Sequence, residues 1–144
     1  MSLLSIVVSV YNEEDNLERF LEVTSGVLQD SMPKNELDYE LIFVNDGSAD
    51  KSREILDGFA AQDTRCCVIH FSRNFGHEAA MIAGIDHAKG DFIVCMDADL
   101  QNPPELLPQM VDKFRDGSDI VLMARAENKD AGWLKKLTSG LFYG

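Results

Sequence analysis

Five short apolar runs recur along the chain, and each ends abruptly in polar residues. A continuous apolar run of this length, rich in β-branched residues, predicts a strand buried in a sheet. Between the runs, apolar residues recur at helical spacing, as in Leu17, Phe20 and Leu28. The alternation predicts an α/β fold with a mostly parallel, Rossmann-like sheet flanked by helices on both faces. The five predicted strands are residues 3–10, 39–44, 66–71, 92–96 and 119–123.

The segments between the predicted strands carry signals for where helices begin and how closely they pack. Asn12 is expected to cap the first helix at its N-terminus, because acids follow in the next turn. Ser48 or Asp50 is expected to cap the second helix. The third helix is rich in small residues such as Gly84, which lets its backbone approach the sheet or a ligand closely. From Trp133 onward the sequence predicts a further amphipathic helix.

Polar clusters follow the first four predicted strands, at residues 11–13, 45–47, 72–74 and 97–99, and Arg125 follows the fifth. In open α/β sheets, ligands bind beyond the carboxyl ends of the strands. Turns are often polar, but acids and an arginine beside apolar strands exceed what a turn requires. We therefore predict a binding site at this edge. Because no G-x-G-x-x-G follows the first strand, a Rossmann dinucleotide site is not expected.

The fourth cluster, Asp97-Ala98-Asp99-Leu100-Gln101, carries the strongest chemical signal. A strand that continued through it would place Asp97 and Asp99 on the same face. Two like charges this close repel, and burying them unpaired is costly. Mg²⁺ or Mn²⁺ would remove the repulsion, because both take oxygen ligands and accept few from the protein when a phosphate supplies the rest. The sequence thus predicts a metal–diphosphate site.

This cluster allows other interpretations. The simplest is a strand-to-loop corner with solvated acids, in which Asp99 or Asn102 caps the following helix. An EF-hand loop beginning at Asp97 would need glycine at its sixth position and glutamate at its twelfth. This chain has Asn102 and Pro108 there, which excludes it. A phosphatase nucleophile typically lies on the first strand of its domain, whereas this pair comes late.

Composition narrows the possible partners. The 144 residues are sufficient for one domain with its own core. With 25 acids against 13 bases, the net charge of −12 argues against a nucleic-acid partner. Cys66, Cys67 and Cys95 lie in apolar runs and form no C-x-x-C, so we expect reduced core thiols and a cytosolic setting. The three histidines show no ligand spacing and are interpreted as structural.

Five short segments occur in order along nearly the whole chain: Val8-Ser9-Val10-Tyr11-Asn12-Glu13-Glu14, Phe43-Val44-Asn45-Asp46-Gly47-Ser48, Phe71-Ser72-Arg73-Asn74-Phe75-Gly76-His77, Met96-Asp97-Ala98-Asp99-Leu100-Gln101 and Trp133-Leu134-Lys135-Lys136. Together they resemble glycosyltransferase family 2, which has the GT-A fold. The third and fourth segments resemble more specifically the polyprenyl-phosphate sugar synthases, which transfer sugars to dolichyl or undecaprenyl phosphate. One departure is Ser9, where the family usually has proline; the change is expected to loosen the nucleoside pocket without removing a polar contact.

The resemblance implies specific roles for residues of this chain. It implies that Asp97, Asp99 and Gln101 ligate Mg²⁺ or Mn²⁺ on the diphosphate, with Asp97 also at the ribose. It implies a catalytic set of Asp97, Asp99 and Arg125, the arginine facing the diphosphate or the acceptor phosphate. The nucleotide-binding set that it implies is Val10, Tyr11, Glu13, Asp46, Gly76, Asp97 and Ala98.

The implied activity is a metal-dependent, inverting transfer of a sugar from a UDP- or GDP-sugar to a polyprenyl phosphate. Two alternatives remain: a family 2 transferase acting on a polysaccharide or protein acceptor, and a non-catalytic nucleotide-binding module. Residues 1–144 are expected to be a truncated GT-A catalytic domain that lacks its C-terminal remainder and any membrane helices. Alone, this domain is expected to be soluble and to bind the donor without turnover.

The full-length protein is expected at the cytoplasmic face of a membrane. The tail helix, with Lys135 and Lys136 near lipid phosphates, is expected to lie in the membrane interface rather than to pack on the missing part of the domain. Exposed apolar surface on a truncated domain makes a homo-oligomer possible.

Overall fold

A computed structural model describes residues 2–31 and 36–118 of the chain. The predicted fifth strand at 119–123, Arg125 and the predicted tail helix lie outside these residues. Within them, no helix combines the length and apolar character that crossing a bilayer requires. The elements are β1 (Ser2–Val10), α1 (Leu17–Ser31), β2 (Leu37–Asn45), α2 (Ser52–Gln62), β3 (Cys66–His70), α3 (His77–His87), β4 (Phe92–Asp97), the 3₁₀ helix η1 (Pro104–Leu106) and α4 (Leu107–Arg115).

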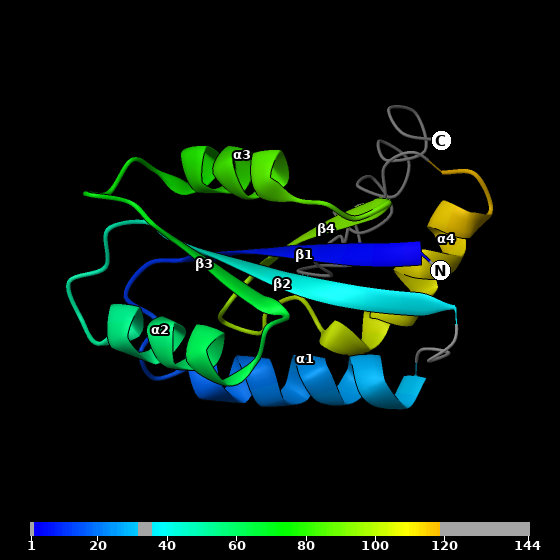
Figure 1. Cartoon of the computed structure of the whole chain (residues 1–144), viewed down its shortest axis with the longest axis horizontal. Helices are drawn as coiled ribbons and strands as arrows, with labels where there is room; N and C mark the ends of the chain where they lie inside the picture. Colours follow the sequence, from blue (N-terminus) through cyan, green and yellow to red (C-terminus); the bar gives the residue numbers. More distant parts are fainter. Residues whose placement is uncertain (1, 32–35, 119–144) are drawn as a thin grey trace, which may run out of the picture.

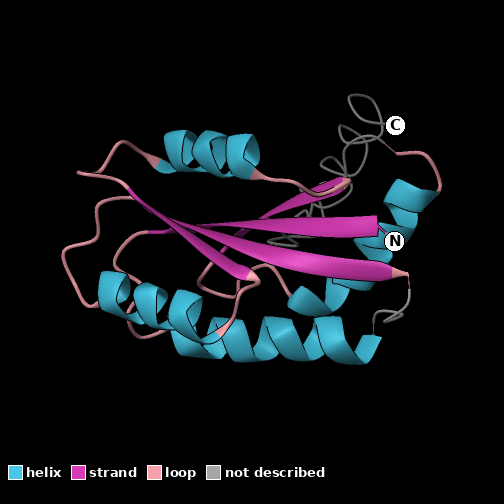
Figure 2. Ribbon diagram, viewed as in Figure 1, coloured by secondary structure: helices cyan, strands magenta, loops and turns pink. Residues whose placement is uncertain are grey.

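The four strands form one parallel sheet in the order β3-β2-β1-β4. Helices α1, α2 and α4 cover one face, and α3 covers the other (Figures 1 and 2). The larger core lies between the sheet and helices α1, α2 and α4, and it includes the fully buried Phe20, Phe43 and Leu56. The smaller core lies under α3. The predicted architecture, strand alternating with helix around a parallel sheet, is confirmed.

Helix α3 packs closely on the sheet because its inner face carries almost no side-chain bulk. Ala80 is fully buried, and a Cβ built on Gly84 would collide with the Val7 side chain of β1. A larger residue at position 84 would push the helix away from the strand. The small-residue pattern therefore sets the helix-to-sheet distance, as the sequence predicts.

The register of the sheet aligns the carboxyl ends of the strands. Val10 of β1 pairs with Asn45 of β2, which in turn pairs with His70 of β3. On the other side of β1, Ser9 pairs with Asp97 of β4. The loops that follow all four strands consequently begin at the same edge.

Three expectations about local structure are wrong. The N-cap of α2 is Lys51 rather than Ser48 or Asp50, and no side chain caps it, although Asp50 Oδ1 accepts the N–H of Ser52 at 2.9 Å. Asn12 does not cap α1, which begins five residues later at Leu17; it adopts a left-handed conformation with φ of 52° in the preceding loop. The cysteines are not all core thiols, since Cys66 is buried but Cys67 and Cys95 are exposed. Consecutive strand residues point to opposite faces, and β3 and β4 are the outer strands of the described sheet, so burial is incomplete there.

The thiols are therefore expected to differ in reactivity. Burial, assisted by the negative charge of Asp63, raises the pKa of Cys66 to about 11. At pH 8 only about one Cys66 thiol in a thousand would be ionised, and the thiolate is the reactive form. Iodoacetamide should label Cys67 in the folded chain and Cys66 only after unfolding in urea, as followed by peptide mass spectrometry. Equal labelling rates in the folded chain would contradict this burial.

Candidate functional site

A pocket of about 270 Å³ opens at the carboxyl edge of the sheet. Its volume is near the lower end of the range for small-molecule sites. The loops after all four strands contribute to it, and its polar lining is dominated by carboxylates. The lining residues are Ser9, Tyr11, Glu13, Asp46, Asn74, Gly76, His77, Asp97, Ala98 and Asp99.

Asp46 holds the β3–α3 loop in place from the end of β2. It is 2% exposed, and its carboxylate accepts hydrogen bonds from the backbone N–H of Phe75 at 2.7 Å and of Gly76 at 3.2 Å. The Asn74 side-chain amide donates to it as well, at 3.2 Å. Because a buried carboxylate needs such donors, this loop and Asp46 stabilise each other. Any contact from Asp46 to a bound nucleoside would use the lone pairs that remain.

The β1–α1 loop is joined to the β2–α2 turn by reciprocal hydrogen bonds. The backbone N–H of Asn12 donates to Ser48 Oγ at 2.9 Å, and the Ala49 N–H donates to Asn12 Oδ1 at 2.8 Å. One residue further along, the Glu13 N–H donates to Ser52 Oγ at 3.0 Å. These bonds compensate for the left-handed backbone of Asn12, which non-glycine residues adopt at a cost. They fix Tyr11 and Glu13 at the pocket wall.

Asp97 and Asp99 line the pocket from the end of β4 and the turn that follows it, next to the end of β1. Strand β4 ends at Asp97, so strand alternation does not extend to Asp99, yet both residues line the same pocket. The turn is shaped by Leu100, with φ of 60°, and by the Gln101 N–H, which donates to Asp99 Oδ1 at 3.2 Å. Asp97 also lies 3.6 Å from the ring Nδ1 of His77.

The electrostatics of the lining limit which ligands can enter. The pocket lining has four carboxylates, those of Glu13, Asp46, Asp97 and Asp99. His77 is the one ionisable base among the lining residues. A diphosphate entering alone would be repelled by these carboxylates. A hard cation shared between carboxylates and phosphate would convert that repulsion into attraction. Among the described residues, no group of three or more His, Cys, Asp or Glu is arranged as a metal site, so such a cation would need ligands from the substrate.

The model of glycosyl transferase family 2 matches residues 5–143. The chain belongs to glycosyltransferase family 2. The predicted family is thereby confirmed, and the four loops around the pocket carry four of the five segments on which the resemblance rested.

Curated relatives in family 2 are considerably longer than this chain. An uncharacterised glycosyltransferase, YkcC, of Bacillus subtilis (strain 168) is 46% identical over 139 residues, covering 96% of this chain and 42% of the relative. An undecaprenyl-phosphate 4-deoxy-4-formamido-L-arabinose transferase of Edwardsiella ictaluri (strain 93-146) is 39% identical over 145 residues, covering 100% of this chain and 43% of the relative. The chain thus spans less than half the length of these relatives.

A solved structure supports the fold assignment. The mannosyltransferase PcManGT from Pyrobaculum calidifontis, in complex with GDP-Man and Mn²⁺, matches with a TM-score of 0.65 and 22% sequence identity. The match covers 80% of this chain and 33% of that protein. The predicted GT-A fold is confirmed.

The structure brings most of the predicted family 2 site residues together but not all of them. Val10 is fully buried in the core and Gln101 is exposed, and neither lines the pocket. Arg125 lies outside the described residues. The roles of all these residues remain predictions. The residues that line the pocket as predicted are Tyr11, Glu13, Asp46, Gly76, Asp97, Ala98 and Asp99.

Three lining residues, Ser9, Asn74 and His77, were assigned no contact to a ligand, although Asn74 belongs to the polar cluster predicted at 72–74 and Ser9 was expected to affect the nucleoside pocket. His77 was interpreted as structural because it shows no ligand spacing, but its side chain is 58% exposed and faces Asp97. Its position was a usable signal, since it follows a strand by only a few residues and so belongs to the same edge of the sheet.

Proposed function

We propose that this chain is the nucleotide-sugar-binding part of a GT-A catalytic domain. The whole protein would transfer a sugar, with inversion, from a UDP- or GDP-sugar to a polyprenyl phosphate such as dolichyl or undecaprenyl phosphate. The observation that carries the proposal is the convergence of Asp97 and Asp99 with the loops bearing Tyr11, Glu13 and Asp46 in one pocket. The name of the Edwardsiella relative supports the acceptor, and the GDP-Man complex of PcManGT supports the donor class.

The donor would lie with its nucleoside against the β1–α1 and β2–α2 loops. Tyr11 is 49% exposed at the pocket wall, so its ring is available to contact a base. The diphosphate would then reach toward Asp97 and Asp99 at the end of β4. Ser9 stands in the same pocket where the family usually has proline, and its hydroxyl adds a small polar group there.

Asp97 and Asp99 fit a hard divalent cation. Two carboxylates facing one pocket provide the oxygen ligands that Mg²⁺ and Mn²⁺ prefer, and the diphosphate would complete the coordination. A bound cation would neutralise the charge that builds on the leaving nucleoside diphosphate. The exposed Gln101 is the weakest member of the predicted ligand set.

In the transfer, an oxygen of the lipid phosphate forms a bond to the anomeric carbon as the bond from that carbon to the nucleoside diphosphate breaks. The diphosphate leaves with the bonding electron pair. A phosphate monoester, with a second pKa of about 6, is largely ionised at neutral pH and scarcely needs a general base. The chain's own contribution is to hold the donor in orientation and to surround the reacting bond with fixed charges.

A thermal-shift panel of UDP- and GDP-sugars tests the proposal. With Mn²⁺ present, the correct nucleotide at a hundred times its Kd should stabilise the chain by about 2.7 kcal/mol, raising Tm by several degrees. Without Mn²⁺ the shift should be much smaller. If no nucleotide changes Tm in the presence of Mn²⁺, the proposed donor site is wrong. Sugar transfer to polyprenyl phosphate by a protein of the relatives' full length separates the transferase from a binding module.

A further inference from the structure

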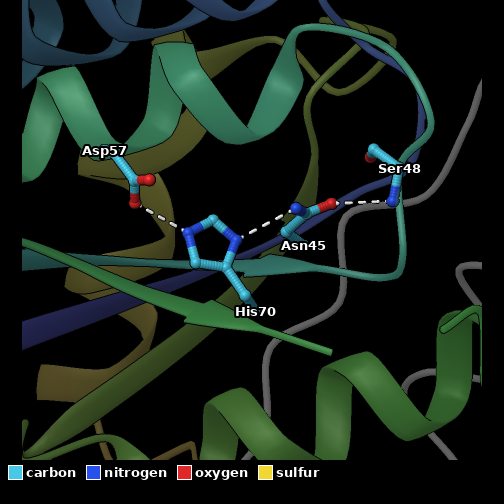
Figure 3. A network of polar contacts seen from close by, with 4 residues as sticks. All are labelled: Asn45, Ser48, Asp57 and His70. Carbon is cyan, nitrogen blue, oxygen red and sulfur yellow. Dashed lines mark hydrogen bonds and ion pairs between the residues drawn. The ribbon is translucent and has the colours of Figure 1, made fainter. Parts of the chain in front are cut away.

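A hydrogen-bonded network of four residues lies directly behind the pocket loops (Figure 3). Asn45 and His70 are the last residues of β2 and β3 and pair in the sheet, so their side chains are neighbours. Asn45 Nδ2 lies 3.0 Å from His70 Nδ1, and His70 Nε2 lies 2.7 Å from Asp57 Oδ1 on α2. At the other end, the Ser48 N–H lies 3.1 Å from Asn45 Oδ1.

The two ends of the network determine the polarity of every bond in it. A backbone N–H can only donate, so Asn45 must present its oxygen to Ser48 and its NH₂ group to His70. The NH₂ group can only donate, so Nδ1 of His70 must accept and carry no proton. The ring proton of the neutral imidazole therefore resides on Nε2, where the Asp57 carboxylate accepts it.

Burial makes this arrangement stringent. Asn45 is 2% exposed, so its amide cannot exchange a lost partner for water. A flipped amide would set its oxygen against the lone pair of His70 Nδ1 and its NH₂ group against the Ser48 N–H, losing both bonds. The side chain of His70 is 16% exposed, whereas that of Asp57 is 58% exposed. Water can replace a lost partner of the exposed Asp57 but not of the buried Asn45, so losing the bond between His70 and Asn45 should cost more.

The network continues to the pocket wall through Ser48. While its N–H is held by Asn45, its Oγ accepts the Asn12 N–H at 2.9 Å. Asn12, with its left-handed backbone, lies between Tyr11 and Glu13, both of which line the pocket. The orientation of one buried amide thus connects the imidazole of His70 to the loop that forms one side of the site.

We propose that His70 is a positioning residue for the pocket. Its Nε2-protonated tautomer, set by Asp57, orients the Asn45 amide, which fixes Ser48 and through it the loop of residues 11–13. His70 does not line the pocket and acts only through these neighbours. The consequence for nucleotide affinity rests on the proposed function, whereas the effect on the loop does not.

Two substitutions test the two ring nitrogens of His70 separately. In His70→Asn the side-chain amide oxygen can take the place of Nδ1 and accept from Asn45, while the contact with Asp57 is lost. In His70→Gln the amide NH₂ can take the place of Nε2 and donate to Asp57, while Asn45 loses its acceptor. We expect His70→Asn to bind UDP or GDP with Mn²⁺ within about threefold of the parent chain, and His70→Gln about tenfold more weakly, because a buried donor is left unpaired.

NMR of the nucleotide-free chain tests the positioning separately from binding. The imidazole ¹⁵N spectrum of His70 should show Nε2 protonated and Nδ1 unprotonated. The amide resonances of Asn12, Ser48 and Ala49 should move in His70→Gln and stay close to the parent positions in His70→Asn. His87→Gln is the control: His87 lies on α3, its Nδ1 is 2.8 Å from the Ala83 carbonyl oxygen, and its replacement should change none of these readings.

The possible outcomes distinguish a failure of the positioning role from a failure of the proposed function. A protonated Nδ1, or unmoved loop resonances in a folded His70→Gln, would overturn the proposal. So would nucleotide affinity equal to that of the parent chain in His70→Gln. If the loop resonances respond as expected but neither UDP nor GDP binds the parent chain, the positioning role stands and the proposed function fails.

Discussion

Replacing Asp99 with alanine is expected to abolish Mn²⁺-dependent binding of UDP and GDP. Asp99 lines the pocket with Asp97, and the fit to a cation rests on this pair. Loss of residues that merely support metal ligands typically costs 10- to 100-fold, so losing a ligand should weaken binding by at least about a hundredfold. Titration calorimetry with and without Mn²⁺ measures the affinities. When Mn²⁺ is omitted, the parent chain and Asp99→Ala should no longer differ in nucleotide affinity.

Asp63→Ala is the matched control for this substitution. Asp99 and Asp63 are both half-buried, and each accepts a hydrogen bond from the backbone N–H two residues ahead, Gln101 at 3.2 Å and Arg65 at 2.9 Å. Asp63 lies between α2 and β3, outside the pocket. Both variants lose one turn bond and one negative charge, so only Asp99→Ala should lose nucleotide binding. Unchanged affinity in Asp99→Ala would remove the metal role from this residue.

Replacing Gly47 with alanine is expected to cause the largest loss of stability. Gly47 has φ of 71°, a conformation that costs other residues energy, and a Cβ there would collide with the backbone carbonyl carbon of Arg73 and the backbone nitrogen of Asn74. Backbone strain and overpacking each cost about 1–3 kcal/mol, so the free energy of unfolding should fall by roughly 2–6 kcal/mol. Urea unfolding followed by circular dichroism measures it.

Gly58→Ala provides the control for this second prediction. Gly58 lies within α2, and a Cβ added to it would meet nothing within 4 Å. Alanine is a better helix former than glycine, so this variant should be more stable than the parent chain by about 0.5–1 kcal/mol. A Gly47→Ala chain as stable as the parent would show that the loop of residues 73–74 can move aside, which would contradict the prediction.

The elements near the pocket show where local sequence was sufficient. The apolar runs that became β1, β2 and β4 are long and bounded by polar clusters, so their type did not depend on knowing their neighbours. The small residues of α3 predicted a close approach to the sheet, and Ala80 and Gly84 make it. In each case the information lies within a few residues.

The misplaced residues show where local sequence was insufficient. Asn12 resembles an N-cap in its immediate context, but its partners are Ser48 and Ala49, which are 36 and 37 positions away. Cys67 and Cys95 lie in apolar runs, yet their exposure depends on where β3 and β4 stand in the sheet. His77 ends one of the segments that resemble the family but was given no role, and only the fold shows that it lines the pocket and lies 3.6 Å from Asp97.

The sequence by itself determined the alternation of strand and helix, the family, and the edge of the sheet at which polar residues gather, because these follow from periodicity and short motifs. Only the tertiary structure decided that Asp46 holds the β3–α3 loop, that His70 faces Asn45, and that Gln101 stays outside the pocket. The reason is physical: a hydrogen bond between loops depends on strand register and side-chain direction, which are fixed when the sheet assembles.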